Sequence, residues 1–268
     1  IVQETARGKQ ARDLPIADHA AAFKEIVANL LSPEHGVLRT IDEIQAVGHR
    51  VVHGGEQFSD SALITEAVMQ AIRACVPLAP LHNPPNLTGI EAAQSLLPKV
   101  PQVAVFDTAF HESMPRTAFL YALPYELYSQ DHIRRYGFHG TSHRYVSERA
   151  AAFMGKAPAA FRCITCHLGN GCSISAVDGG ICVDTSMGLT PLEGLIMGTR
   201  SGDLDPAVVW YLMEHKKLDY HEINDLLNKK SGLLGLAGIG SGDLRDIEDA
   251  AAEGNKQAEI ALKAFTYR

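Results

Sequence analysis

The chain has 268 residues, 46% of them hydrophobic, which predicts a globular protein with one large domain or two moderate ones. Acidic residues outnumber basic ones 31 to 24 and the formal net charge is -7 at pH 7, which argues against nucleic acid as a partner. No apolar run approaches the roughly 18 residues of a membrane span, and the first residues lack the order of a secretory signal, so we expect no membrane contact and a cytoplasmic location.

Apolar spacing in the first part of the chain predicts alternating helices and strands. Residues 14–31 have helical spacing, residues 45–55 read as a buried strand that ends in glycines, and residues 64–75 are again helical. A proline-rich loop then leads to a helix that Asn86 is expected to cap. Residues 102–107 are expected to form a short strand that ends at the carboxylate of Asp107. This order predicts an α/β fold.

The second part of the chain starts a similar series with a helix near residues 143–154. Three short strands follow it, and the tight turns between them predict an antiparallel meander. They are RCITCHL, CSISAV and GICVD. The loop of residues 184–206 is too long to be mere linkage, so we expect it to carry function. Mainly helical segments are expected from residue 206 to the end.

The five cysteines are odd in number and mostly lie in expected strands, which predicts reduced, buried thiols rather than a disulfide framework. Cys163 and Cys166 form a C-x-x-C pair, but residues i and i+3 of a strand point to opposite faces. A redox or metal function for this pair is therefore not expected.

The stretch HLGNG at residues 167–171 joins two of the expected strands and has two interpretations. Glycines on both sides of an asparagine suit an ordinary hairpin, and they also let a phosphate approach the backbone. Asp107 is a clearer candidate, because open α/β sheets bind ligands beyond the carboxyl ends of their strands.

The sequence patterns do not favour a zinc site or a serine hydrolase. The histidine pair of HGTSH, at residues 139–143, lies in a glycine-containing loop without a nearby cysteine, and no G-x-S-x-G elbow occurs. Two arginines, a histidine, a carboxylate and a glycine turn instead suit phosphoryl transfer, whose barrier is lowered mainly by positioning and by cations around the transferring group. Arginine is suited to this task because its planar fork pairs with carboxylate or phosphate oxygens in a bidentate manner.

Six motifs in order carry a resemblance that covers essentially the whole chain. They are GHRVVHGG (48–55), APLHNPPN (79–86), VFDTAFH (105–111), RRYGFHGTSH (134–143), HLGNG (167–171) and DTSMGLTPLEGLIMGTRSGDLDP (184–206). In this order they resemble the acetate kinase family of short-chain carboxylate kinases. The resemblance implies the actin-like α/β fold of acetate and sugar kinases: two related domains, each with a sheet that begins with a three-stranded meander, and the active site in the interdomain cleft. It also implies reversible, direct in-line transfer of the ATP γ-phosphoryl group to acetate, giving acetyl phosphate and ADP, with Mg²⁺ and in a homodimer.

The resemblance implies catalytic roles for four residues. Arg50 and Arg200 would hold the carboxylate and the transferring phosphoryl group from two sides, and His139 would donate a hydrogen bond to the phosphoryl oxygens. Asp107 corresponds to the family's active-site carboxylate. A carboxylate substrate is already ionised near neutral pH and needs no proton-abstracting base, which favours an organising role for Asp107 over an acid/base role.

The resemblance also implies two binding sites. The apolar pocket for the substrate methyl group corresponds to Val52, Leu81, Phe138 and Pro191, beside Arg50. The nucleotide site corresponds to His167, Leu168, Gly169, Asn170, Gly171, Asp243, Leu244 and Arg245. Leu244 stands where the family also has an aromatic residue. Discrimination per methylene is worth only about 1 to 3 kcal/mol, so residue types do not separate acetate from propionate or butyrate.

Two features of the family are not in this sequence: an initial strand with a phosphate loop, and a later nucleotide loop with a magnesium-binding glutamate. We therefore expect that the chain lacks pieces at both ends, with residues 1–110 in the first domain and residues 111–268 in the second. No metal ligand is assigned, because the family's ligands fall in the missing segments. Two alternatives stay open: the same chemistry on propionate or butyrate, and an inactive fragment that binds nucleotide or carboxylate.

Overall fold

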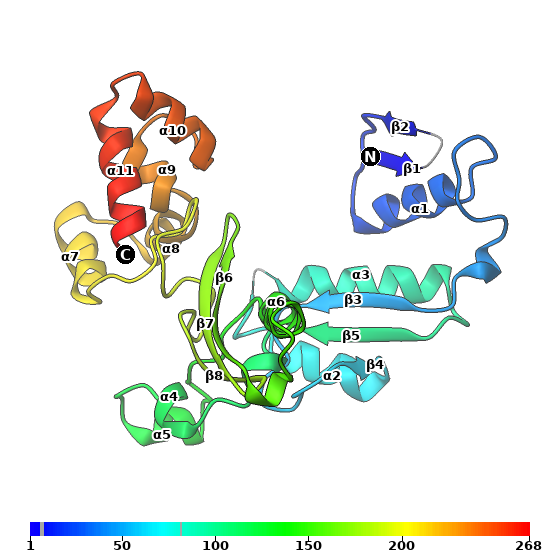
Figure 1. Ribbon diagram of the computed structural model, residues 1–268, viewed down its shortest axis with the longest axis horizontal. Coiled ribbons are helices and arrows are strands. Elements are labelled where there is room, and N and C mark those ends of the chain that lie inside the picture. Colours follow the sequence, from blue (N-terminus) through cyan, green and yellow to red (C-terminus); the bar gives the residue numbers. More distant parts are fainter. Residues whose placement is uncertain (6–7, 81) are drawn as a thin grey trace. The chain divides into compact units, whose positions relative to one another are not determined.

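The computed structural model describes residues 1–5, 8–80 and 82–268 (Figure 1). The described chain divides into two compact units, Ile1–Ala109 and Phe110–Arg268. Each unit has its own hydrophobic core. The helices and strands of the second part of the chain therefore form a core without help from the first.

The first unit begins with a hairpin and a helix. β1 (Val2–Thr5) pairs antiparallel with β2 (Gly8–Ala11), and α1 (His19–Leu30) follows. The Asp18 side chain accepts a hydrogen bond from the backbone N–H of Ala21 at 2.7 Å and so caps the helix. The expected helix of residues 14–31 was wrong at its N-terminal end, because this capping carboxylate starts the helix later.

A small mixed sheet with two helices forms the rest of the first unit. Its elements are β3 (Val47–Val51), β4 (Ala62–Leu63), α2 (Glu66–Ala74), α3 (Asn83–Leu96) and β5 (Gln102–Phe106). The strand order is β3-β5-β4, with β3 parallel to β5 and β4 antiparallel to it. Figure 1 shows α3 running along β3. These three strands are not a meander, because β3 and β5 are parallel and parallel neighbours need a crossover connection. The meander that the family resemblance implies for this domain begins with strands that were expected to fall outside this sequence.

The N-cap of the helix α3 lies four residues earlier than expected. Its first residue is Asn83 and its N-cap is His82, with prolines in the first turn. Proline suits the first turn of a helix, because its missing N–H has no partner there in any case. The expectation that Asn86 caps the helix was therefore wrong. The Asn86 side chain instead accepts a hydrogen bond from the backbone N–H of Val52.

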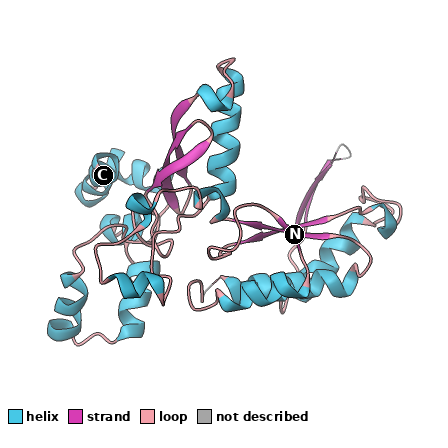
Figure 2. Cartoon of the chain, turned by 90° about the horizontal axis from the view of Figure 1, so that it is seen from below, coloured by secondary structure: helices cyan, strands magenta, loops and turns pink. Residues whose placement is uncertain are grey.

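The second unit begins with short helices and an antiparallel meander. Its elements are α4 (Arg116–Phe119), α5 (Tyr125–Ser129), α6 (Gly140–Phe153), β6 (Arg162–Leu168), β7 (Cys172–Asp178) and β8 (Ile181–Thr185). The strand order is β6-β7-β8, so the meander predicted from the three short strands is confirmed. The helix α6 packs against β6, and the magenta strands of Figure 2 show the strong twist of this sheet.

The long loop and the final helices complete the second unit. No helix or strand interrupts residues 186–206 of the described chain, as predicted. The helices that follow are α7 (Ala207–Lys216), α8 (Tyr220–Lys229), α9 (Gly232–Ala237), α10 (Leu244–Ala252) and α11 (Lys256–Tyr267). Leu233, Ile247 and Ala258 are buried in the core that α9, α10 and α11 share. Three short 3-10 helices occur at Ile41–Glu43, Ala109–His111 and Pro158–Ala160.

All five cysteines are free thiols. Cys163 is half-buried whereas Cys166 is exposed, so the two lie on opposite faces of β6 as their spacing predicts. Burial raises the pKa of the Cys75 thiol to about 11 and that of Cys182 to about 12. These two thiols stay protonated and unreactive near neutral pH. None of the helices in the described part of the chain combines the length and the apolar character that crossing a membrane requires.

Candidate active site

Arg50 and Asp107 lie at the carboxyl ends of two parallel strands in the first unit. Arg50 precedes the last residue of β3, and Asp107 directly follows β5. The Arg50 guanidinium donates from Nη2 to Oδ2 of Asp107 at 2.6 Å and from Nε to Oδ1 at 3.0 Å. The Asp107 side chain is 2% exposed and that of Arg50 is 65% exposed. A buried carboxylate therefore fixes the orientation of an exposed guanidinium.

This geometry also favours a permanent charge on Arg50. The hydrogen bond to Asp107 raises the pKa of Arg50 above its ordinary value. Both carboxylate oxygens of Asp107 accept hydrogen bonds from the guanidinium. Asp107 thus has the contacts of a residue that orients an arginine.

Two asparagines of the NPPN motif hold the backbone that follows β3. The Asn83 side chain accepts a hydrogen bond from the backbone N–H of His53 at 3.2 Å and donates to the His53 carbonyl at 3.0 Å. The Asn86 side chain accepts from the backbone N–H of Val52 at 3.1 Å. Sequence reasoning selected Val52 but missed Asn83 and gave Asn86 a different role. Two asparagines that flank a proline pair were the available signal, because an amide side chain can replace a missing strand partner.

The residues expected to form the apolar pocket are distributed over both units. Val52 is buried in the first unit, while Phe138 and Pro191 belong to the second, where Phe138 is buried and Pro191 half-buried. Leu81 lies outside the described residues. The pocket that these residues form together stays a prediction.

His139 lies immediately before α6 and has an unusual backbone conformation. Its φ of 59° falls in the left-handed region, which residues other than glycine rarely adopt and which costs on the order of 1 kcal/mol. The imidazole ring stacks on that of His167, with the ring centroids 4.1 Å apart. The His139 Nδ1 atom makes a 2.8 Å hydrogen bond with Oγ of Ser173 in β7. Strained backbone of this kind is typical of functional sites.

The hairpin glycine Gly171 lets the side chains of Arg200 and His139 both lie close to its backbone. A Cβ atom at Gly171 would lie 3.1 Å from Nη1 of Arg200 and 3.4 Å from Nε2 of His139. The Arg200 Nη1 atom also donates to the carbonyl oxygen of Pro191 at 3.2 Å. Within the second unit, the side chains of Arg200 and His139 therefore lie close to the backbone of Gly171, and these three predicted residues come from separate motifs.

A group that sequence reasoning did not select holds the long loop in place. Arg135 Nη2 pairs with Oε1 of Glu193 at 2.6 Å, and Arg135 Nη1 donates to the carbonyls of residues 185, 186 and 187. The Tyr121 hydroxyl donates to Glu193 and accepts from the backbone N–H of Leu189 at 2.9 Å. Burial and the neighbouring Glu193 carboxylate raise the pKa of Tyr121, so its hydroxyl remains a donor.

The loop clamp, which is Tyr121, Arg135 and Glu193, requires a glycine at position 188. A Cβ atom there would overlap the Glu193 carboxylate and the Tyr121 hydroxyl. Arg135 and Glu193 both lie inside motifs that the sequence singled out. Their pairing across 58 residues leaves no local signal in the sequence.

The tip of the β6–β7 hairpin borders a pocket of about 460 Å³ in the second unit. Its lining includes Leu168, Gly169 and Asn170 from the hairpin, and Asp243 and Leu244 from the start of α10. The pocket therefore brings together the two segments that were expected to contact the nucleotide. The backbone N–H of Gly198 donates to the Asn170 carbonyl at 2.9 Å, which ties the hairpin to the loop that carries Arg200.

Three residues of the expected nucleotide site have other contacts. His167 Nδ1 makes a 2.9 Å hydrogen bond with Ser142 Oγ. Asp243 caps α10 by accepting a hydrogen bond from the Arg245 backbone N–H at 2.9 Å, and its carboxylate pairs with the Arg245 guanidinium at 3.0 Å. The acidic side chain thus stabilises the helix start beside the pocket.

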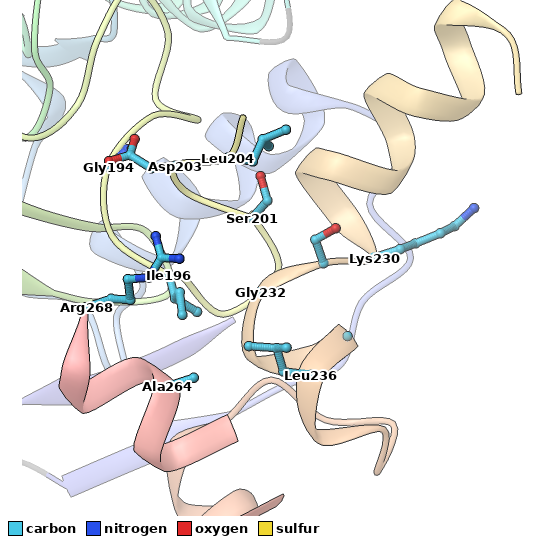
Figure 3. A pocket seen from close by; sticks show the side chains of 12 residues that line it. Gly194, Ile196, Ser201, Asp203, Leu204, Lys230, Gly232, Leu236, Ala264 and Arg268 are labelled. Atoms are coloured by element: carbon cyan, nitrogen blue, oxygen red, sulfur yellow. The ribbon is translucent and has the colours of Figure 1, made fainter. Parts of the chain in front are cut away.

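A second pocket, of about 520 Å³, contains none of the predicted site residues (Figure 3). Ser201 and Asp203 line it from the long loop, Leu236 from α9, and Ala264 from α11. Asp203 accepts a hydrogen bond from the Gly194 backbone N–H at 2.7 Å and so closes the loop on itself. The loop that carries Arg200 therefore contributes lining residues to both pockets.

Among the described residues, no group of three or more His, Cys, Asp or Glu side chains is placed to hold a metal ion. The best candidate carboxylate, Asp107, accepts hydrogen bonds from Arg50 at both oxygens. The described side chains therefore do not fit a metal held by protein ligands alone.

The architecture matches solved structures of one class of kinase. An acetate kinase from Porphyromonas gingivalis superimposes with a TM-score of 0.93 at 48% identity, over 100% of this chain and 67% of that one. A propionate kinase from Francisella tularensis superimposes with a TM-score of 0.91 at 46% identity, over 98% and 66% of the two chains. The fold is thus the actin-like α/β fold of the acetate and sugar kinases.

Sequence comparison gives the family. The model of the acetokinase family matches residues 1–268. An acetate kinase from Natranaerobius thermophilus is 56% identical over 268 residues, which are 100% of this chain and 67% of that protein. The chain belongs to the acetokinase family, and it spans about two thirds of the length of the relatives that it matches.

Proposed function

We propose that the protein catalyses reversible transfer of the γ-phosphoryl group of ATP to acetate, giving acetyl phosphate and ADP. The family match over the whole chain and the acetate kinase names of its relatives support this activity. The observation that carries it is the approach of Arg200 Nη1 and His139 Nε2 above Gly171, beside the pocket of about 460 Å³. Two donors at a glycine hairpin suit the charge that develops on a transferring phosphoryl group.

Each proposed role follows from a contact. Arg200 and His139 bind the phosphoryl oxygens, and the Asn170 hairpin binds the remaining phosphates through its backbone N–H groups. Arg50 binds the acetate carboxylate in the orientation that Asp107 fixes. Acetate is already ionised near neutral pH, so Asp107 organises this arginine and abstracts no proton.

Magnesium enters this proposal only with the nucleotide. Mg²⁺ is commonly held by substrate phosphates together with one or two carboxylates, rather than by a cage of protein ligands. Homodimer formation and a cytoplasmic location rest on the family resemblance.

A propionate kinase is the second candidate, because one solved structure with a TM-score of 0.91 has that name. The proposed methyl pocket includes Val52 and Pro191, and one methylene changes binding by only about 1 to 3 kcal/mol. Butyrate is the next larger substrate of the same kind. A catalytically inactive fragment that binds nucleotide or carboxylate is the alternative from another class.

The test is acyl hydroxamate formation by the full-length protein with ATP and Mg²⁺, using acetate, propionate and butyrate in parallel. We expect product with acetate preferred, and a fall of about 100-fold or more in kcat for Arg200→Ala, as for removal of one oxyanion donor elsewhere. Near-normal activity of Arg200→Ala contradicts the assigned role. Absence of product with all three acids contradicts the kinase activity itself.

A further inference from the structure

A chain of hydrogen bonds leads from His139 into the buried side of the meander. Ser173 Oγ lies between two imidazole nitrogens, 2.8 Å from Nδ1 of His139 and 2.7 Å from Nε2 of His143. The other nitrogen of His143, Nδ1, lies 2.8 Å from Oγ1 of Thr165. His143 and Ser173 are 1% and 0% exposed, so no water competes for these bonds. We call Thr165, His143 and Ser173 the buried relay.

The buried relay couples the proton positions of the two histidines. A hydroxyl group has a single proton, and the two imidazole nitrogens are the partners of the Ser173 hydroxyl, so its proton has an acceptor only when Ser173 donates to one ring and accepts from the other. Burial, with His111 and His167 nearby, lowers the pKa of His143 to about 3, so this ring is neutral and has one N–H near neutral pH. When the N–H of His143 is at Nε2, Ser173 must donate to Nδ1 of His139. A neutral His139 then has its own proton on Nε2.

The distances around Thr165 indicate that the N–H of His143 is at Nε2. The Thr165 hydroxyl has two possible acceptors, Nδ1 of His143 at 2.8 Å and the Ser175 carbonyl oxygen at 3.4 Å. The shorter distance is that of a normal hydrogen bond, and the longer one is at the limit. If His143 instead donated from Nδ1 to Thr165, the proton of the Thr165 hydroxyl would have only the long contact with the Ser175 carbonyl oxygen. Thr165 therefore donates to His143, which leaves the His143 proton on Nε2.

We propose that Thr165 and Ser173 are positioning residues that hold the proton of His139 on Nε2. Thr165 acts through His143, whereas Ser173 contacts His139 directly. This nitrogen is the one that lies beside Arg200 above Gly171. The buried relay thus selects, for the neutral His139 ring, the tautomer whose Nε2 donates toward that position before any ligand binds. The purpose of the donor, binding of a phosphoryl oxygen, rests on the proposed function, whereas the proton position does not.

The test is ¹⁵N NMR of this chain with ¹⁵N-labelled histidine at neutral pH, because protonated and unprotonated imidazole nitrogens have well separated shifts. A His139→Gln variant assigns the His139 signals. We expect Nε2 to be protonated and Nδ1 to be unprotonated in the unsubstituted chain. A proton on Nδ1, or on both nitrogens, overturns the proposal without the need for any relay variant.

Matched variants then test whether the buried relay is the cause. Thr165→Val and Ser173→Ala should each shift the His139 signals toward a mixture of both tautomers. Thr165→Ser keeps the hydroxyl, so its His139 shifts should equal those of the unsubstituted chain. Ser175→Ala is the control, because Ser175 is equally buried in β7 but its hydroxyl pairs with Thr185. Unchanged His139 signals in folded Thr165→Val and Ser173→Ala overturn the proposal.

The NMR measurement tests the role of the buried relay independently of the proposed kinase activity. The proton position is read without substrate or turnover, so a full-length protein without kinase activity leaves the NMR result intact. Conversely, an active protein with His139 protonated on Nδ1 overturns only the role of the buried relay.

Discussion

Individual side chains of the proposed site are held by buried partners. Asp107 holds Arg50, and Asn83 and Asn86 hold the backbone beside it. His139 is held by Ser173. For Arg50 and His139, an exposed or half-buried side chain is oriented by a buried one, so less rotational freedom is lost when a ligand binds.

The role of Asp107 leads to a test with an isosteric change. Asp107→Asn keeps the shape of the side chain but removes the charge that fixes the Arg50 guanidinium. We expect kcat of the full-length protein to fall by about 100-fold in the hydroxamate assay, as for the loss of residues that orient a catalytic group. Asp178→Asn is the matched control, because it removes a solvent-exposed Arg–Asp pair with Arg162. Equal activity of both variants contradicts the orienting role.

Two buried histidines make the stability depend on pH. Burial lowers the pKa of His111 to about 4 and that of His143 to about 3, from an ordinary value of 6.5. The unfolded chain therefore takes up protons below about pH 6.5 that the folded chain does not. The free energy of unfolding should fall as the pH drops from about 6.5 toward 4, by at most about 1.4 kcal/mol per pH unit for each histidine.

Urea unfolding of this chain at pH 7, 6 and 5 measures this dependence. His143→Gln should reduce its slope, whereas His221→Gln, which replaces an exposed histidine, should leave the slope unchanged. An equal slope in His143→Gln and the unsubstituted chain contradicts the prediction.

At the scale of elements, the loop of residues 186–206 is ordered by the loop clamp although it has no regular secondary structure. The backbone carbonyls of the last residue of β8, residue 185, and of the first two loop residues, 186 and 187, accept hydrogen bonds from one guanidinium. Pro191 and Arg200 follow within the same loop. The clamp therefore determines where two proposed site residues lie.

Two glycine substitutions test the clamp. Gly188→Ala places a methyl group against Glu193 and Tyr121, so we expect a loss of about 1 to 3 kcal/mol in the free energy of unfolding and faster hydrogen exchange at Leu189. Gly89→Ala is the control, because a Cβ atom there meets nothing within 4 Å on the helix α3, and it should stabilise by up to about 1 kcal/mol. If Gly188→Ala is as stable as Gly89→Ala, the clamp is not rigid.

The sequence predicted the longer helices and strands and the meander because they follow from local patterns, whereas the hairpin of β1 and β2 was not predicted. Alternating residues and short turns identify β6, β7 and β8, and the strand before Asp107 is equally local. The parallel pairing of β3 and β5 was not predicted, because it depends on a crossover through two helices. The loop clamp and the buried relay were missed for the same reason: Arg135 and Glu193, or His143 and Ser173, meet only after the chain has folded.

At the scale of the whole molecule, the division into two units separates the proposed tasks. Arg50 and Asp107 belong to the first unit, and the hairpin, His139 and Arg200 belong to the second. Each set has its own network of hydrogen bonds. Nucleotide binding is therefore expected to depend on residues of the second unit alone.

Calorimetry with ADP and Mg²⁺ tests this separation in the given chain. We expect measurable binding, weakened about tenfold by Asn170→Ala, which removes an amide side chain beside the pocket of about 460 Å³. Arg50→Ala should leave the affinity unchanged. A similar loss of affinity in both variants contradicts the assignment of the nucleotide to the second unit.

The unequal exposure of the cysteines offers a practical route to such measurements. Cys75, Cys172 and Cys182 are buried, Cys163 is half-buried, and Cys166 is exposed in β6, two residues before Leu168 at the edge of the pocket. A maleimide fluorophore added to the native chain should therefore attach first at Cys166 without any engineered substitution. The natural sequence thus provides an attachment point for an optical reporter next to the hairpin, and its emission would follow ligand occupancy in real time.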